Sequence, residues 1–231
     1  MYTQKGDNQP ITAEQVYRQI LRRIIKLKLE PGQLISENQM AKEYGVSRSV
    51  IRTVFVRLQQ IGFLDVYPQR GTYVSRIDLH HIEDLLILRT AVEKEVIYEM
   101  FTSLGHEERS QLVSQLEENM AEQEKCRDET DYSGRFPRID SAFHKIMIDS
   151  VGRYALVNML NDLMYHVQRW RNFDVAFGNR ISELIREHWA IVNAIKAEDL
   201  ILAQQSMANH LETITSIAGY AVAKYPSYFI A

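Results

Sequence analysis

Four side chains in the second half of the chain have the types and spacing of metal ligands. Asp140 and His144 are four residues apart, so a helix would project both from one face. His188 and His210 each fall among apolar residues that repeat with helical spacing, which predicts that both point inward. Three imidazoles and one carboxylate suit a divalent metal ion. Zinc is favoured, with nickel, manganese and iron as the alternatives.

The positions of His188 and His210 along their helices also match. A turn is expected at 198–199; His188 lies ten residues before it, and His210 lies eleven residues after it. At about 1.5 Å of rise per residue, both lie roughly 15 Å from that turn, level with each other across an antiparallel pair. Arg186 and Glu187 are expected to face outward. A single inward histidine is usually a hydrogen-bonded core residue, but four matched groups favour a metal.

A buried ion pair or an anion site is indicated in the segment 82–101. Arg89 falls on its inward stripe, and Glu93 follows one turn later. An unpaired buried charge is very costly, so Arg89 needs a partner. Either the two side chains pair with each other, or Arg89 and Glu93 contribute to a pocket that binds an anionic effector. The sequence leaves both interpretations open.

The same periodicity predicts a helical second half. Further helices are expected at 106–127, 136–150, 154–173, 179–197 and 199–223, which with 82–101 makes a bundle of six or seven helices.

The balance of charged residues differs between the two halves of the chain. Residues 1–76 hold twelve lysines and arginines against six acidic residues, and the remainder holds fifteen against twenty-four. We expect a domain over 1–76, a linker over 77–81 and a second domain over 82–231.

Composition narrows the classes of protein. The sequence has no apolar run long enough to cross a membrane, and its first residues lack the apolar core of a secretory signal. A cytoplasmic protein is therefore expected. Cys126 is the single cysteine, so an internal disulfide and a thiolate zinc cluster are both excluded.

The basic first domain has the pattern of a winged helix-turn-helix. A helix is expected over 12–29, and a second opens at Ser36, where Gln39 completes the spacing of a capping box, and ends at Gly45. The segment 46–62 then reads as a recognition helix with Ser47 as its N-cap. The flanking runs FLDVY and GTYVS predict a β-hairpin around PQRG. The fold class is mainly α, with the helical bundle following this domain, and double-stranded DNA is the expected partner.

The run from LEPGQLISENQMAKEYGVSRSVIRTVFVRLQQIGFL through RGTYV resembles the DNA-binding domain of the GntR family of bacterial transcription regulators. The resemblance implies that operator DNA is contacted at the start of the recognition helix and at the wing. Asn38 on the preceding helix and the expected cap Ser47 are added to these positions. The full set is Asn38, Ser47, Arg48, Ser49, Arg52, Arg70 and Gly71.

The second half is similar to the helical FCD effector domain found in the FadR branch of that family. The segments that carry this similarity are RIDSAFHKIMIDSVGRYAL, EHWAIVNAIKAED and MANH. The resemblance implies a divalent metal held by Asp140, His144, His188 and His210. It also implies an effector that is a small organic or sugar acid.

A ligand-responsive regulator, and not an enzyme, is the resulting hypothesis. It would bind a palindromic operator as a homodimer and respond to a small carboxylate effector. Two alternatives stay open: a regulator that responds to the metal without an organic effector, and a metallohydrolase fused to a DNA-binding module. Against the hydrolase, the sequence has no HExxH-like motif that would place a general base at fixed spacing.

Overall fold

The fold is described from a computed structural model that covers residues 11–129, 134–178, 180–213 and 218–230, with only the backbone considered at 161–163 and 174–178. The chain divides into two compact units, Met1–Ile77 and Asp78–Ala231, which are described separately. No helix of the described part is both long enough and apolar enough to cross a membrane.

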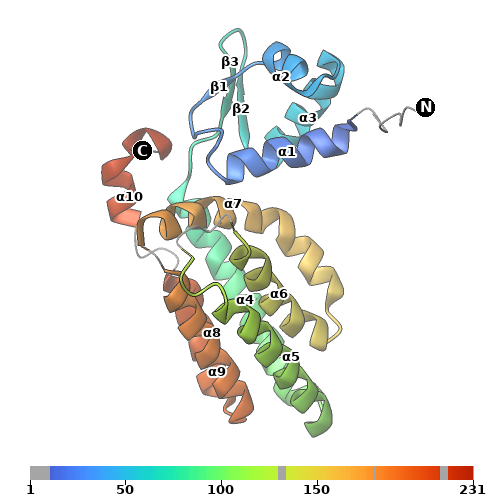
Figure 1. Ribbon diagram of the computed structural model, residues 1–231, viewed down its shortest axis with the longest axis vertical. Helices are drawn as coiled ribbons and strands as arrows, with labels where there is room; N and C mark the ends of the chain where they lie inside the picture. The colour runs from blue at the N-terminus through green and yellow to red at the C-terminus, as the bar shows by residue number, and fades with distance from the viewer. Residues whose placement is uncertain (1–10, 130–133, 179, 214–217, 231) are drawn as a thin grey trace, which may run out of the picture. The chain divides into compact units, whose positions relative to one another are not determined.

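Over its described residues, 11–77, the first unit has three helices and a small antiparallel sheet (Figure 1). The helices are α1 (Ala13–Ile25), α2 (Glu37–Tyr44) and α3 (Arg48–Gln60). The strands are β1 (Leu34–Ile35), β2 (Leu64–Tyr67) and β3 (Gly71–Val74), in the order β1-β3-β2. The apolar faces of α1 and α3 pack against each other through fully buried side chains that include Ile20, Ile24, Ile51 and Leu58. The winged helix-turn-helix is thus as predicted.

The turns of this unit show which local predictions hold. Gly45 ends α2 in the left-handed conformation, with φ of 65°, and the Ser47 hydroxyl accepts the Val50 N–H at 3.4 Å. Ser36 does precede α2, but its side chain makes no capping hydrogen bond, so the predicted capping box is wrong. Pairing of the preceding β1 with β3 already fixes the backbone at this point. The two-residue β1 is too short for a periodic pattern to reveal.

The wing needs glycine at position 71. Gly71 has φ of 112°, and a Cβ there would stand 2.7 Å from Cδ1 of Leu34. Leu34 belongs to β1, which pairs with β3 beside the hairpin. A side chain at this position would therefore strain the backbone and also force the exposed Leu34 side chain to move.

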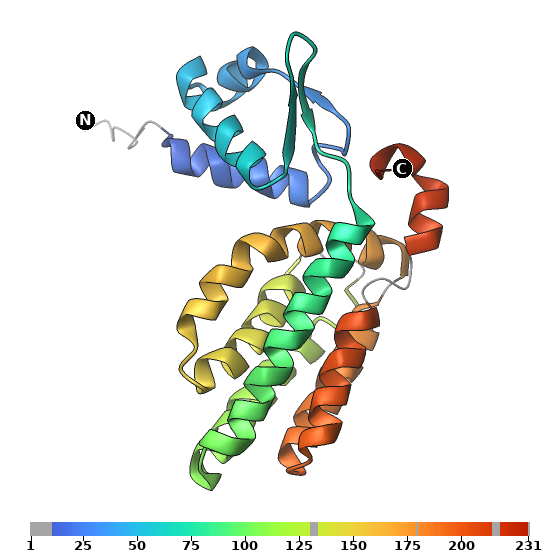
Figure 2. The ribbon, with the colours of Figure 1, turned by 180° about the vertical axis from the view of Figure 1, so that it is seen from behind.

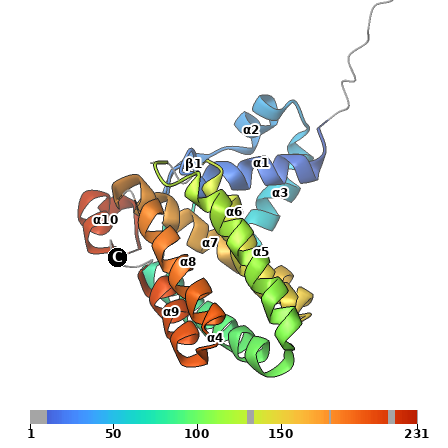
Figure 3. The same ribbon diagram turned by 60° about the horizontal axis from the view of Figure 1, so that its bottom comes forward.

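The second unit is a bundle of long helices (Figures 2 and 3). They are α4 (Leu79–Ser103), α5 (His106–Glu124), α6 (Phe136–Ser150), α7 (Tyr154–Gly178), α8 (Ile181–Lys196) and α9 (Leu200–Glu212), followed by the short α10 (Ala218–Lys224) and a 3-10 turn at Pro226–Tyr228. Helix α9 packs on α8 and α4, and α5 packs on α6 and α8. The predicted fold class, mainly helical with a bundle after the winged domain, is confirmed.

Several helix boundaries differ from the sequence-based expectation; α1, for example, ends at Ile25 and not at 29, and α7 continues to Gly178 and not only to 173. Helix α4 begins at Leu79, inside the expected linker 77–81, because the Asp78 carboxylate caps it by accepting the His81 N–H. Of the single helix expected over 199–223, the structure describes α9, which ends at Glu212, and α10, which begins at Ala218. Residues 214–217 lie outside the described part of the chain.

Candidate functional site

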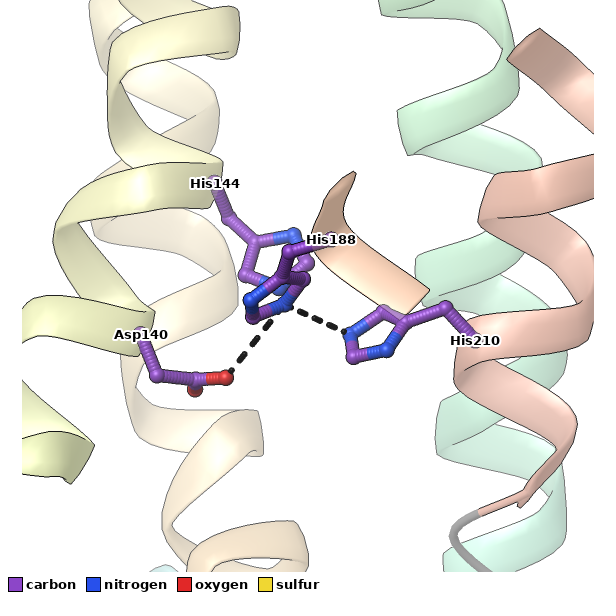
Figure 4. Close-up of side chains that lie close together, drawn as sticks. All are labelled: Asp140, His144, His188 and His210. Atoms are coloured by element: carbon purple, nitrogen blue, oxygen red, sulfur yellow. Dashed lines mark hydrogen bonds and ion pairs between the residues drawn. The ribbon is translucent and has the colours of Figure 1, made fainter. Parts of the chain in front are cut away.

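The four predicted metal-binding side chains meet inside the bundle. Asp140 and His144 project from α6, His188 from α8 and His210 from α9, and they point toward one another (Figure 4). One potential ligand atom from each lies within 4.8 Å of the others. All four are buried, with His188 and His210 at 0% exposure. The helices thus assemble a ligand set from three separate stretches of the chain.

Each histidine is held through its Nδ1 by an oxygen from a neighbouring side chain. The pairs are His144 with Glu93 Oε2 at 2.5 Å, His188 with Gln123 Oε1 at 2.7 Å, and His210 with Glu187 Oε2 at 2.9 Å. A carboxylate can only accept, so the imidazoles of His144 and His210 donate from Nδ1. Such partners fix both the tautomer and the ring orientation of metal-binding histidines.

The hydrogen bonds of Gln123 settle the tautomer of His188. The Gln123 amide nitrogen donates to the Asn119 Oδ1 at 2.8 Å, and the Asn119 amide nitrogen donates to the Ile139 carbonyl at 3.1 Å. The oxygen of Gln123 therefore faces His188, whose Nδ1 must be the donor. All three histidines then carry a lone pair on Nε2.

These lone pairs face a common point. Nε2 of His188 lies 3.2 Å from Nε2 of His210 and 3.6 Å from Oδ1 of Asp140. Nε2 of His144 is buried and has no hydrogen-bond partner in the described part of the chain. Three converging imidazole nitrogens and one carboxylate oxygen are the donor set that zinc and related ions prefer. The residues present therefore fit a divalent metal.

Electrostatics keep these groups in the forms that bind metal. Burial, reinforced by a neighbouring imidazole, holds the pKa of His188 and of His210 well below that of a free imidazole, so both are neutral at pH 7. Burial also lowers the pKa of His144, although Glu93 acts in the opposite direction. Burial disfavours the charged form of Asp140, but Arg171 holds the pKa of that carboxyl well below its usual range.

A pocket opens beside Asp140 and His144. Its lining includes Arg89, Glu93 and Arg171. Arg171 Nη1 donates to Asp140 Oδ2 at 2.7 Å, and Arg89 Nε donates to Glu93 Oε1 at 2.6 Å. The predicted pairing of Arg89 with Glu93 is therefore present, and both residues line the pocket, whereas the binding of an anionic effector there stays a prediction.

The seven residues predicted to contact DNA all lie exposed on the first unit, at the sites predicted from the sequence: Asn38, Ser47, Arg48, Ser49, Arg52, Arg70 and Gly71. Glu37, at the start of α2, orders two of them. Its carboxylate accepts hydrogen bonds from Arg48 Nη2 at 3.1 Å and from Arg52 Nε at 3.1 Å. The two arginines are thus held together at the exposed start of the recognition helix.

Each of the two units matches the model of a known protein family. Residues 84–213 match the model of the FCD domain, and residues 12–74 match that of the bacterial regulatory proteins of the gntR family. The chain belongs to the GntR family. This GntR regulator is 26% identical to the HTH-type transcriptional repressor RspR of Escherichia coli K12, over 92% of this chain and 91% of RspR.

Other relatives support the same assignment. A regulator from an unstable DNA locus of Streptomyces ambofaciens is 28% identical, over 86% of this chain and 81% of its own length. The solved structure of E. coli McbR/YncC superposes with a TM-score of 0.65 over 90% of this chain and 97% of that chain, at 17% identity, which shows the shared fold. This GntR regulator is a transcriptional regulator and not an enzyme.

Sequence reasoning missed most of the groups that hold the histidines. Glu187 was expected to face outward, which is wrong: it is half-buried against His210. Gln123 could have been found, because it lies three residues after Met120 and so continues the buried stripe of Leu112, Leu116 and Met120 on α5. Arg171 could have been found in the same way, because it lies four residues after Val167 on the face of α7 that also carries Leu160 and Met164. In this GntR regulator these residues orient the candidate ligands.

Glu187→Gln should weaken metal binding by about 10- to 100-fold, because an amide is a poorer acceptor for the His210 Nδ1–H and no longer raises the basicity of the ring. Isothermal titration of the metal-free protein with zinc measures the change. Glu183→Gln is the matched control, since Glu183 also binds Arg180 but contacts none of the three histidines. Equal losses in both variants would show that Arg180, and not His210, transmits the effect.

Proposed function

We propose that this GntR regulator controls transcription in response to a small carboxylate bound beside a divalent metal, zinc being favoured. Asp140, His144, His188 and His210 hold the metal. The observation that carries the proposal is the convergence of three Nε2 lone pairs and a carboxylate next to a pocket that Arg89 and Arg171 line. When bound, the ion supplies positive charge at the inner end of that pocket.

The lining of the pocket favours this function over metal sensing alone. Arg89, Lys145 and Arg171 outnumber Glu93 and Asp140 in its lining, so the wall is net positive before any metal is counted. A structural metal site needs no such opening, since structural sites are closed by protein ligands. A small anion that reaches Asp140 and His144 from the pocket would find cationic groups on its way.

DNA recognition by two copies follows from the size of one winged domain. A single recognition helix contacts few base pairs, so a homodimer that places two such helices on the halves of a palindrome is expected. The effector can act only if it binds one arrangement of the dimer more tightly than another. The proposal therefore includes a shift between a DNA-binding and a released arrangement.

The test combines metal analysis with operator binding. Elemental analysis of the purified full-length protein should find about one divalent ion per chain. Operator affinity is then measured with metal alone and with metal plus each of a series of carboxylates. A change that requires both supports the proposal. A change with metal alone would favour a metal sensor, and turnover of an acid would favour the hydrolase.

A further inference from the structure

We infer that the effector is a carboxylate with an apolar body, and not a polyhydroxylated sugar acid. This inference rests on the proposed function, since it specifies the class of acid that the same pocket accepts. It comes from the division of the pocket lining into a polar inner end and an apolar wall.

The apolar wall is a continuous stripe. Helix α7 contributes four apolar side chains with a spacing of three, four and three residues, which puts them on one face, and α6 adds one more from the opposite side. They are Val157, Leu160, Met164 and Val167 from α7 and Ile148 from α6. A ligand whose carboxylate lies near His144 would extend its remaining carbons along this stripe.

Much of the polar lining is already engaged within the protein. Arg89 binds Glu93 and Arg171 binds Asp140, as described above. The Ser141 hydroxyl donates to the Pro137 carbonyl at 2.9 Å. Lys145 is paired with Asp149. Each of these contacts takes up part of the hydrogen-bonding capacity that a row of hydroxyls would need from the lining.

Transfer from water into this pocket favours a ligand with a hydrocarbon chain over one with a hydroxyl on each carbon. A hydroxyl that leaves water and gains no hydrogen bond opposes binding. A methylene on the same carbon gains from leaving water and packing against the stripe. Of two acids of equal length, the one with methylenes at several of these carbons should therefore bind at least about tenfold more tightly than the one with hydroxyls there.

Two six-carbon acids test this directly. 2-Hydroxyhexanoate and gluconate share the carboxylate and the 2-hydroxyl, so their chelating ends are the same, and they differ only from C3 to C6. Isothermal titration of the zinc-loaded full-length protein should find 2-hydroxyhexanoate at least about tenfold tighter. Equal affinity, or tighter gluconate, overturns the inference and leaves the proposed function intact. If neither acid binds the zinc-loaded protein, the proposed function fails and the inference fails with it.

A variant of nearly the same shape tests whether the apolar stripe causes the preference for 2-hydroxyhexanoate. Val157→Thr adds one hydroxyl to the stripe and should reduce the preference for 2-hydroxyhexanoate several-fold. Met159→Thr is the control, because Met159 lies two residues away on α7 and is 68% exposed outside the pocket lining. An unchanged preference in Val157→Thr, with circular dichroism like that of the unmodified protein, would show that the acids bind elsewhere.

Discussion

The Arg52→Ala variant should bind its operator at least about tenfold more weakly than the unmodified protein. Arg52 is exposed one turn into the recognition helix and is held beside Arg48 by Glu37. A well-placed arginine contributes about 1–3 kcal/mol of discrimination at each base pair that it reads. A dimer loses that contribution at both half-sites. Fluorescence anisotropy at fixed salt, with an operator selected from random duplexes, measures the change.

The matched control is Arg18→Ala. Arg18 is also an exposed arginine in an ion pair, with Glu14 on α1, but it lies outside the recognition helix and the wing. Exposed pairs of this kind contribute little to stability, so this variant should fold and bind operator within about twofold of the unmodified protein. If Arg52→Ala kept full affinity, the recognition helix would read DNA through other residues. If both variants lost affinity equally, a general charge effect would explain the result.

His188→Ala should remove the metal and the effector response while DNA binding in the absence of effector persists. His188 is fully buried between the other ligands, and its loss leaves three groups where there were four. The metal content should fall from about one ion per chain to a small fraction of that, because each missing ligand costs at least the 10- to 100-fold typical of its supporting groups. Elemental analysis and operator titration with and without acid measure both effects.

Folding must be separated from metal loss in this variant. The His188 ring stacks on Phe143 with centroids 4.3 Å apart, so alanine also leaves a cavity. His188→Gln fills more of that space and should give the same loss of metal. His166→Ala is a second control, because His166 contacts His81 away from the candidate site. If both His188 variants failed to fold while His166→Ala folded, the metal centre would be structural.

Periodicity was sufficient to predict where the candidate ligands meet. His188 and His210 were matched by counting residues from a turn at 198–199, and the structure places that turn at Glu198, with φ of 56°, and Asp199, which caps α9. Their Nε2 atoms lie 3.2 Å apart, in agreement with the equal heights that this count gives. Helical phase and rise are local properties, so a single sequence carries them. The role of the four side chains as ligands stays a prediction.

The groups that support the ligands could not be predicted in the same way. Glu93 reaches His144 across 51 positions of sequence, and Gln123 reaches His188 across 65. Such contacts depend on which helices become neighbours, which periodicity does not specify. The prediction for Glu187 was wrong for a different reason. A charged residue beside an inward histidine usually faces solvent, but α9 lies close enough for Glu187 to reach His210.

The three histidines that share one tautomer make the bundle locally frustrated when it holds no cation. Their Nδ1 atoms keep the protons, so the converging Nε2 atoms repel one another and nothing in the described part of the chain lies between His188 and His210 to relieve this. A bound ion converts that repulsion into attraction, and by mass action it adds about 4 kcal/mol of stability at a free concentration a thousand times its dissociation constant. The melting temperature of the bundle would then report the free metal concentration around it.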